Sequence, residues 1–282
     1  MFTLKVQNDK GQALNLTDDP RYIVYKIDGL APPQANINSS VNTTADGSSI
    51  NSVRLQDRNI VLYISIEGDV ETNRIALYSY FPIKKTVTLY FSNGSRDVSI
   101  DGTIETIECD LFSNKQTAQI SIVCPKPYFK DTTTIVTRFS EITSLFEFPF
   151  SIGEWGIAFS EYTPIVRKDI INNSDVETGT IIELFATGTV VNPVIYDVQK
   201  RTHISLLFTM QPSDLIVINT NHGEKSINLV RDGVTTNILG NMSKDSTWFT
   251  LSSGDNVFTY TAENGDIDLQ ITFYTNVLYS GV

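Results

Sequence analysis

Side chains that could carry catalysis or bind a metal are few and scattered in this sequence. The two histidines are His203 and His222, and the two cysteines are Cys109 and Cys124. A histidine can act as a general base, and thiolates with imidazoles can bind zinc. Neither cysteine lies in a C-x-x-C pattern, and no ligand cluster is present, so we expect no metal site. We interpret His203 as a partly exposed strand residue and His222 as a turn residue.

Carboxylates are abundant, but their spacing does not favour a catalytic pair. A glycosidase needs two carboxylates about 5 to 10 Å apart in a cleft. Strand alternation places Glu105 and Glu108 on opposite faces, which excludes that pair. Asp18 and Asp19 do not belong to a loop with regularly spaced calcium ligands. Signatures of nucleotide-binding proteins, zinc proteases and serine hydrolases are also absent. We therefore expect no catalytic residues and no cofactor, and an enzyme is the least favoured function.

Exposed aromatic side chains would be the platform of a sugar-binding protein. Trp155 lies beside glycines, and Trp248 lies in the stretch STWFTLSSGDN, which reads as a strand edge. We favour core or strand-end packing for both. A carbohydrate-binding module or adhesin remains the alternative function.

Composition excludes several other classes. The chain has 282 residues, with 32 acidic and 21 basic side chains and a net charge of −11. This charge disfavours nucleic acid or an anionic membrane as the main partner. The N-terminal residues lack a secretory signal pattern, and no window approaches 18 consecutive apolar residues. We expect a cytoplasmically made protein in which Cys109 and Cys124 are reduced, buried thiols.

The first half reads mainly as strands, with one helix. Residues 59–68 place Ile60, Leu62, Ile64 and Ile66 on one buried face. The helix is expected at residues 69–81, with Asp69 as its cap and Pro82 after it. Further strands are expected at residues 86–112 and 117–125, with turns at Asn93-Gly94 and Asp101-Gly102.

The strand pattern of the sequence is interrupted after residue 125. Residues 125–162 lack clean alternation and indicate a linker, with a domain boundary near Leu145. About nine short strands are then expected, including TWFTLSSG at residues 247–254, with turns at Asn221-His222-Gly223, Asp232-Gly233 and Asn264-Gly265. We therefore predict an all-β protein with one short helix and two domains, residues 1–145 and 146–282, the second an antiparallel β-sandwich.

The stretch DGLAPPQANINSS, Asp28 to Ser40, predicts a rigid connector. Gly29 can adopt a positive φ, and Pro32 and Pro33 fix φ near −65°. Ala31, which precedes Pro32, is restricted to extended geometry.

The order of several motifs resembles a known family. Gly29-Leu30-Ala31-Pro32-Pro33 is followed by Asp46-Gly47-Ser48, by Arg54 and by Arg58-Asn59-Ile60. CPKPYF follows at residues 124–129, then GTVVNPVIYD at residues 188–197 and the ending YSGV. This succession resembles distal tail (Dit) proteins from long-tailed phages of Gram-positive hosts.

The resemblance implies a structural protein of the virion tail tip, made in the bacterial cytoplasm. It implies a homohexameric ring built by an N-terminal β-barrel domain with a helix, and a galectin-like C-terminal sandwich. The implied partners are further copies of the chain, the tail tube protein, the tail-lysin or fibre hub and receptor-binding proteins. Longer family members carry inserted carbohydrate-binding modules, for which this chain has no room.

Charge agrees with a ring through which DNA passes without specific binding. Six copies of −11 give −66, which would repel phosphate if part of it lines a channel. We further hypothesise that Gly29, Pro32 and Pro33 form a stiff strap that begins a ring-facing loop, Asn38 to Gln56. Arg54 and Arg58 are expected to pair with acidic groups at the barrel rim.

Overall fold

The computed structural model describes residues 2–41, 46–113, 115–144, 160–164 and 167–282. The chain divides into two compact units: unit 1 is Met1–Thr133 with Leu278–Val282, and unit 2 is Thr134–Val277. The division falls within strands β10 (Phe129–Arg138) and β23 (Leu269–Tyr279), so the chain returns to unit 1 for its last residues. The boundary predicted near Leu145 lies outside the described residues.

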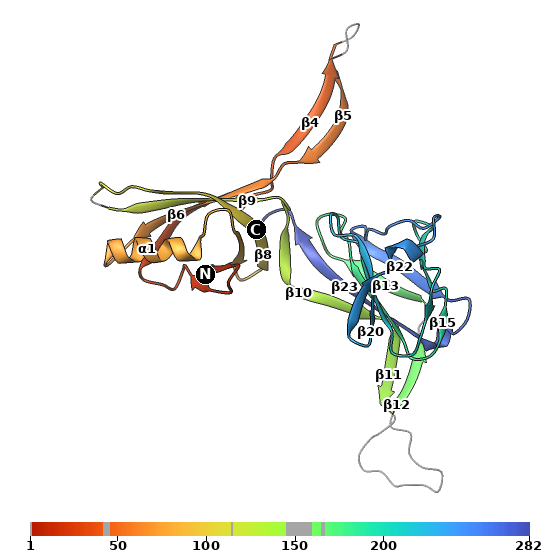
Figure 1. Ribbon diagram of the computed structural model, residues 1–282. Coiled ribbons are helices and arrows are strands. Elements are labelled where there is room, and N and C mark those ends of the chain that lie inside the picture. The colour runs from red at the N-terminus through yellow and green to blue at the C-terminus, as the bar shows by residue number, and fades with distance from the viewer. Residues whose placement is uncertain (1, 42–45, 114, 145–159, 165–166) are drawn as a thin grey trace. The chain divides into compact units, whose positions relative to one another are not determined.

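Unit 1 contains a bent antiparallel sheet around one apolar core (Figure 1). Its strand order is β2 (Ala13–Asn15), β1 (Thr3–Asn8), β7 (Thr86–Ser92), β8 (Asp97–Cys109), β9 (Thr117–Cys124), β6 (Arg58–Ile66) and β3 (Tyr22–Asp28). Strand β10 also pairs with β8, through Lys130 and Asp131. The expected buried face of β6 is confirmed, because Ile60, Leu62 and Ile64 are all at most 1% exposed.

The predicted helix is confirmed as α1 (Val70–Tyr80), which lies next to β1 and β6. The Asp69 carboxylate accepts from the backbone N–H of Thr72 at the N-terminus. Leu77 and Phe81 are fully buried in the core of unit 1 and fix the side of the helix that faces the sheet.

The predicted turn at Asp101-Gly102 is wrong. Strand β8 continues through both residues for 13 residues, and its Gly102 pairs with Val87. A Cβ atom at Gly102 would lie 2.5 Å from Ile122 Cγ2 and 2.7 Å from Cys124 Sγ. The glycine therefore permits close packing of side chains from β9, a role that the Asp-Gly pair does not reveal.

A register shift between Ile104 and Thr106 also interrupts the alternation of β8. Glu105 and Glu108 are both exposed, and Ser121 donates to Glu105 at 2.9 Å. The argument that alternation separates these two glutamates onto opposite faces does not hold across this bulge.

Unit 2 contains two main antiparallel sheets. In one, β23 is followed by β14 (Ile181–Ala186), β19 (Leu215–Asn219), β20 (Ser226–Arg231) and β21 (Val234–Asn237). The other has the order β13 (Arg167–Asn172), β22 (Gly254–Thr261), β16 (Val194–Asp197) and β17 (Thr202–Ser205). Phe258 of β22 and Phe273 of β23 have ring centroids 5.0 Å apart, so the two sheets share one core, as expected for a sandwich.

Shorter elements complete unit 2. They are the strand pairs β11 (Ser140–Ser144) with β12 (Ser160–Pro164) and β15 (Val190–Val191) with β18 (Thr209–Met210), and the 3-10 helices η1 (Leu239–Asn241) and η2 (Asp266–Asp268).

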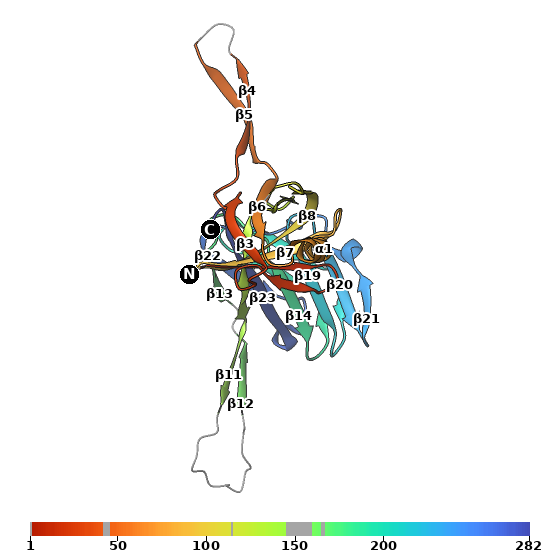
Figure 2. The ribbon, with the colours of Figure 1, turned by 90° about the vertical axis from the view of Figure 1, so that its left-hand side faces the viewer.

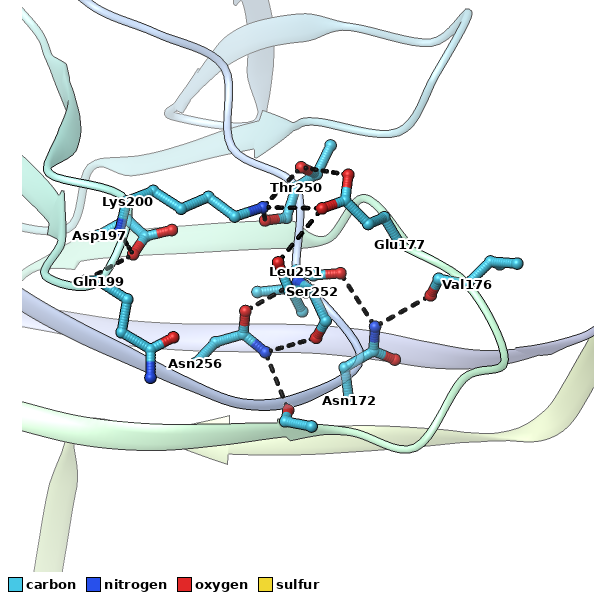
Figure 3. Close-up of polar contacts among 11 residues, drawn as sticks. Asn172, Val176, Glu177, Asp197, Gln199, Lys200, Thr250, Leu251, Ser252 and Asn256 are labelled. Atoms are coloured by element: carbon cyan, nitrogen blue, oxygen red, sulfur yellow. Dashed lines mark hydrogen bonds and ion pairs between the residues drawn. The ribbon is translucent and has the colours of Figure 1, made fainter. Parts of the chain in front are cut away.

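The strand predicted at TWFTLSSG is not present. Phe249 and Leu251 are buried, but this segment makes only an isolated bridge, between Leu251 and Thr178. Side-chain amides bond much of its backbone instead: Asn172 Nδ2 donates to Leu251 O at 3.0 Å, and Asn256 Oδ1 accepts from Ser252 N at 2.8 Å (Figure 3). Two buried asparagines thus replace ladder partners for an irregular segment.

Candidate interaction site

A two-stranded hairpin extends from unit 1 with no side chain buried. It consists of β4 (Ala35–Val41) and β5 (Ser48–Leu55), and every residue of both strands is exposed. Figures 1 and 2 show it leading away from the other strands of unit 1. The loop predicted for Asn38 to Gln56 is therefore a hairpin. An isolated two-stranded ribbon is marginally stable in water, so this fully exposed hairpin is the candidate surface for contact with another protein.

The hairpin has one apolar and one polar face. Ala35 pairs with Leu55 and Ile37 with Val53, whereas Asn36 pairs with Arg54 and Asn38 with Ser52. Since successive residues of a strand point to opposite faces, the first two pairs lie on one face and the last two on the other.

A β-bulge extends the apolar face along the hairpin. The register shifts between Asn38 and Ser39, so that Ser39 lies opposite Ile50 and Asn51 is the extra residue. Unbroken alternation would put Ile50 on the polar face. The bulge instead adds it to a surface that we call the apolar hairpin face, formed by Ala35, Ile37, Val41, Ile50, Val53 and Leu55. Its Ile37, Val53, Ile50 and Val41 side chains are 56 to 79% exposed.

The base of the hairpin is an irregular joint. The β3–β6 ladder ends at the pair Asp28–Val61, and pairing resumes at Ala35–Leu55. Residues 29–34, the strap, connect the two ladders. Gly29 has the predicted positive φ, +91°, and a Cβ there would lie 2.1 Å from Asn59 O. Pro32 is exposed and Pro33 half-buried. Glycine is thus required at the start of the strap.

Arg58 lies inside this joint and contradicts the prediction that it pairs with acidic groups. It is 2% exposed, and its guanidinium donates to four backbone carbonyls: Gly29, Ala31 at 2.7 Å, Pro127 at 2.7 Å and Ser280 at 2.6 Å. The group also stacks on the Phe129 ring, 4.5 Å from its centroid. Burial lowers the pKa of Arg58. Its inward position follows from strand alternation in β6, which places Arg58 and Ile60 together on the buried face and Asn59 between them on the exposed face.

The other predicted arginine is in a different environment. Arg54 is exposed on the polar face of the hairpin, opposite Asn36. The structure therefore does not place Arg54 and Arg58 in one cluster, although only three residues separate Arg54 in β5 from Arg58 at the start of β6.

The segment Tyr279–Val282 completes the joint, and the sequence did not assign it a role there. Val282 N donates to Leu30 O at 3.2 Å, and Arg96 donates to Gly281 O. The Arg96 guanidinium lies 4.2 Å from the centroid of the Tyr279 ring. No local pattern could have indicated these contacts, because Leu30, Arg96 and residues 279–282 are far apart in the chain.

The residues considered for chemistry lie on different elements, and one of them, Cys124, pairs with Arg58 in the β6–β9 ladder. His203 Nε2 is 3.2 Å from Asp245 Oδ2 and its ring packs on Tyr196, whereas His222 is an exposed turn residue. Both cysteines are free thiols, but Cys109 is only half-buried, so the predicted burial is right for Cys124 alone. Trp248 packs partly buried against the core of unit 2, and Trp155 lies outside the described residues.

Figure 3 shows a polar network in unit 2 in which a lysine and a carboxylate are in contact. Lys200 Nζ donates to Glu177 Oε1 at 3.2 Å and to Thr250 O at 2.8 Å. The hydrogen bond from Lys200 holds the pKa of Glu177 below its usual range, so this carboxylate is ionised at neutral pH and is a poor general acid. The network fastens the segment of Thr250 to its neighbours. It has the features of a structural contact.

No metal or membrane feature was found in the part of the chain that the structure describes. Its His, Cys, Asp and Glu side chains form no group of three or more placed to hold a metal ion. Its helices are too short or too polar to cross a bilayer.

Comparisons with known proteins agree on the type of fold. Residues 173–276 match the family model described as siphovirus-type tail component, C-terminal domain. The crystal structure of the Dit protein (gp 19.1) of phage SPP1, described as a paradigm of the hub adsorption apparatus in phages that infect Gram-positive hosts, aligns with a TM-score of 0.70 at 14% identity, covering 98% of this chain and 99% of that chain.

Two structures of the phage P2 baseplate in its activated conformation also match. The calcium form gives a TM-score of 0.56 at 13% identity over 100% of both chains. The strontium form gives 0.52 at 12% identity over 98% of both chains. A comparison with curated protein sequences gives no match.

Proposed function

We propose that this chain is a structural hub protein of a phage tail tip, because residues 173–276 match the model of the siphovirus-type tail component C-terminal domain and the whole chain has a fold like that of the SPP1 Dit protein. In this role the chain joins the tail tube to the adsorption apparatus. The proposal is of a non-enzymatic protein that acts by assembling with copies of itself and with other tail components.

The observation that carries the proposal within this chain is the apolar hairpin face. A row of aliphatic side chains on an otherwise unsupported ribbon is an aggregation hazard unless another surface covers it. In our proposal, the hairpin of each copy packs on a different surface of the next copy. Such a heterologous contact generates a closed ring when the rotation between copies closes, and we propose six copies.

The remaining partners follow from the position of such a ring. We propose that one side contacts the tail tube protein and the other the tail-lysin or fibre hub, with receptor-binding proteins attached to unit 2. The net charge of −11 per copy suits a ring through which DNA passes without being retained. Unit 2 in this scheme corresponds to the galectin-like sandwich of the family.

The oligomeric state of the purified full chain tests the proposal. Mass photometry should give a species of six times 31.4 kDa, and negative-stain images should show rings with a central channel. A chain that stays monomeric up to high micromolar concentration, without tail partners, would contradict self-assembly as the basis of the function.

A further inference from the structure

Three consecutive carbonyls of the strap are bonded by groups that come from elsewhere in the chain. Gly29 O and Ala31 O accept from Arg58, and the Leu30 O between them accepts from Val282 N. The strap itself belongs to no ladder, so these bonds, together with the one from Gln56 N to Gln34 O at 3.1 Å, hold its backbone. Arg58 also donates to Ser280 O at 2.6 Å, which ties the same guanidinium to the strap and to the segment 279–282.

The strap and this segment also approach each other more closely than side chains would permit. A Cβ atom on Gly281 would lie 2.9 Å from Pro32 Cδ, 3.1 Å from Pro32 N and 3.3 Å from Leu30 O. Pro32 has a fixed ring and cannot rotate away as a flexible side chain would. The absence of a side chain at residue 281 is therefore a condition of the observed joint.

Independent contacts anchor the segment to the body of unit 1. The Tyr279 hydroxyl donates to Asp131 Oδ2 at 3.1 Å, and Arg96 lies over the Tyr279 ring while donating to Gly281 O. Tyr279 and Val282 also pack against the core of unit 1. The segment is thus fixed on one side to the body and on the other to the strap.

We propose that residues 279–282 are a latch that holds the strap in one conformation and thereby sets the direction in which the β4–β5 hairpin leaves unit 1. Arg58 and Arg96 are its positioning residues. The latch rests on the proposed function for its purpose, because a hairpin of fixed direction presents the apolar hairpin face to the next copy in a ring. Its mechanical effect, however, is a property of a single chain.

Spin-label distance measurements on the full chain test that effect. Labels are placed at Ser49→Cys on the hairpin and Lys10→Cys, an exposed turn residue of unit 1, in a Cys109→Ser background. Cys124 is buried and stays unlabelled. The labelled chains also carry Ile37→Asp, which should prevent ring formation. The measured distances are then those within one copy. The latched chain should give one narrow distance distribution.

Gly281→Val should open the latch and broaden that distribution by about two-fold or more, because the strap loses its carbonyl partners. The matched control is Gly240→Val, since a Cβ at Gly240 meets nothing within 4 Å. Arg96→Met provides a milder second variant that keeps the length of the side chain. In chains that keep Ile37, both Gly281→Val and Arg96→Met should also lower the fraction of copies that assemble into rings. Distributions as narrow as in the parent chain for both variants would overturn the latch.

The outcomes for the latch and for the proposed function are distinguishable. A parent chain that forms no rings contradicts the proposed function, while the distance widths still decide about the latch. Circular dichroism and thermal melting of each variant identify a general loss of fold. If Gly281→Val fails to fold, Arg96→Met alone decides: a broader distribution supports the latch, and an unchanged one rejects it.

Discussion

Arg58 and Ser280 are separated by 222 positions in the chain, yet Arg58 Nη2 donates to Ser280 O at 2.6 Å. This contact brings the first residue of β6 to the segment that returns from unit 2. Its partners are carbonyls rather than carboxylates, so the guanidinium satisfies backbone acceptors that no ladder reaches. The joint of the hairpin is therefore organised around one buried cation.

Replacing Arg58 by Met should destabilise the protein by about 3 kcal/mol, because four carbonyls lose their donor. Arg54→Met is the matched control: the residue is exposed, and its change should cost less than about 0.5 kcal/mol. Denaturant unfolding followed by circular dichroism measures both. Equal small effects would show that Arg58 does not organise the joint.

Ile37→Asp should abolish ring formation while leaving the melting temperature nearly unchanged, because Ile37 is exposed in the single chain. Asn38→Asp introduces the same charge one residue further, on the polar face, and should leave rings intact. Mass photometry of the two variants at equal concentration gives the comparison. Loss of rings in both would assign the effect to charge rather than to the apolar hairpin face.

Deleting Asn51 should remove the bulge and restore simple alternation along β5. Ile50 would then directly precede Ser52 and stay opposite Ser39, so the apolar hairpin face is kept. We expect the same ring fraction as for the parent chain. Ile50→Asp, which keeps the register but places a charge on this face, should lower the ring fraction, and loss of rings in the deletion would show that the bulge itself, rather than the apolar hairpin face, is needed for the contact.

The ion pair between Asp214 and Arg231 predicts a specific dependence on pH. Arg231 Nε donates to Asp214 Oδ1 at 2.7 Å, and this bonding lowers the pKa of the buried carboxyl. Because the pKa of Asp214 is lower in the folded than in the unfolded state, its ionised carboxylate stabilises the fold above about pH 4. This stabilisation is lost as the pH falls further.

Asp214→Asn should accordingly lower the free energy of unfolding by about 2 kcal/mol at pH 7, and by less as the pH decreases below about 4. Asp169→Asn, at an exposed position of β13, should show little effect at either pH. Thermal melting across this range measures both. A constant difference between Asp214→Asn and the parent chain would contradict the pH argument.

The two thiols should differ in reactivity. Burial raises the pKa of Cys124 to about 12, so almost none of it is thiolate at pH 8. Cys109 is half-buried and accessible. Intact mass after iodoacetamide treatment should show one modification in the native chain and two after denaturation. Cys109→Ser should remove the native modification, and rapid labelling of Cys124 in the native chain would contradict its burial.

Features of the fold that depend on neighbouring residues could be predicted from the sequence. The buried face of β6 follows from alternation, and α1 follows from its Asp69 cap and the proline after it. The Asp232-Gly233 turn is also confirmed, with positive φ at both residues. In each case the determining interactions lie within a few residues of one another.

The predictions that were wrong concern residues whose partners are distant in the chain. Whether Gly102 bends the chain or admits a neighbour depends on what β9 places against it. The partners of Arg58 come from residues 29–31, 127 and 280, so no window of sequence contains the site. The bulge that completes the apolar hairpin face depends on the register between two strands, which composition does not specify.

The return of residues 278–282 to unit 1 has a consequence for biosynthesis. Chains emerge from the ribosome N-terminal end first, and domains fold as they appear. The hairpin is therefore made early, but its strap acquires its final hydrogen bonds only after all of unit 2 has been translated. A nascent or truncated chain that lacks residues 279–282 would therefore carry a hairpin whose orientation the proposed latch does not set.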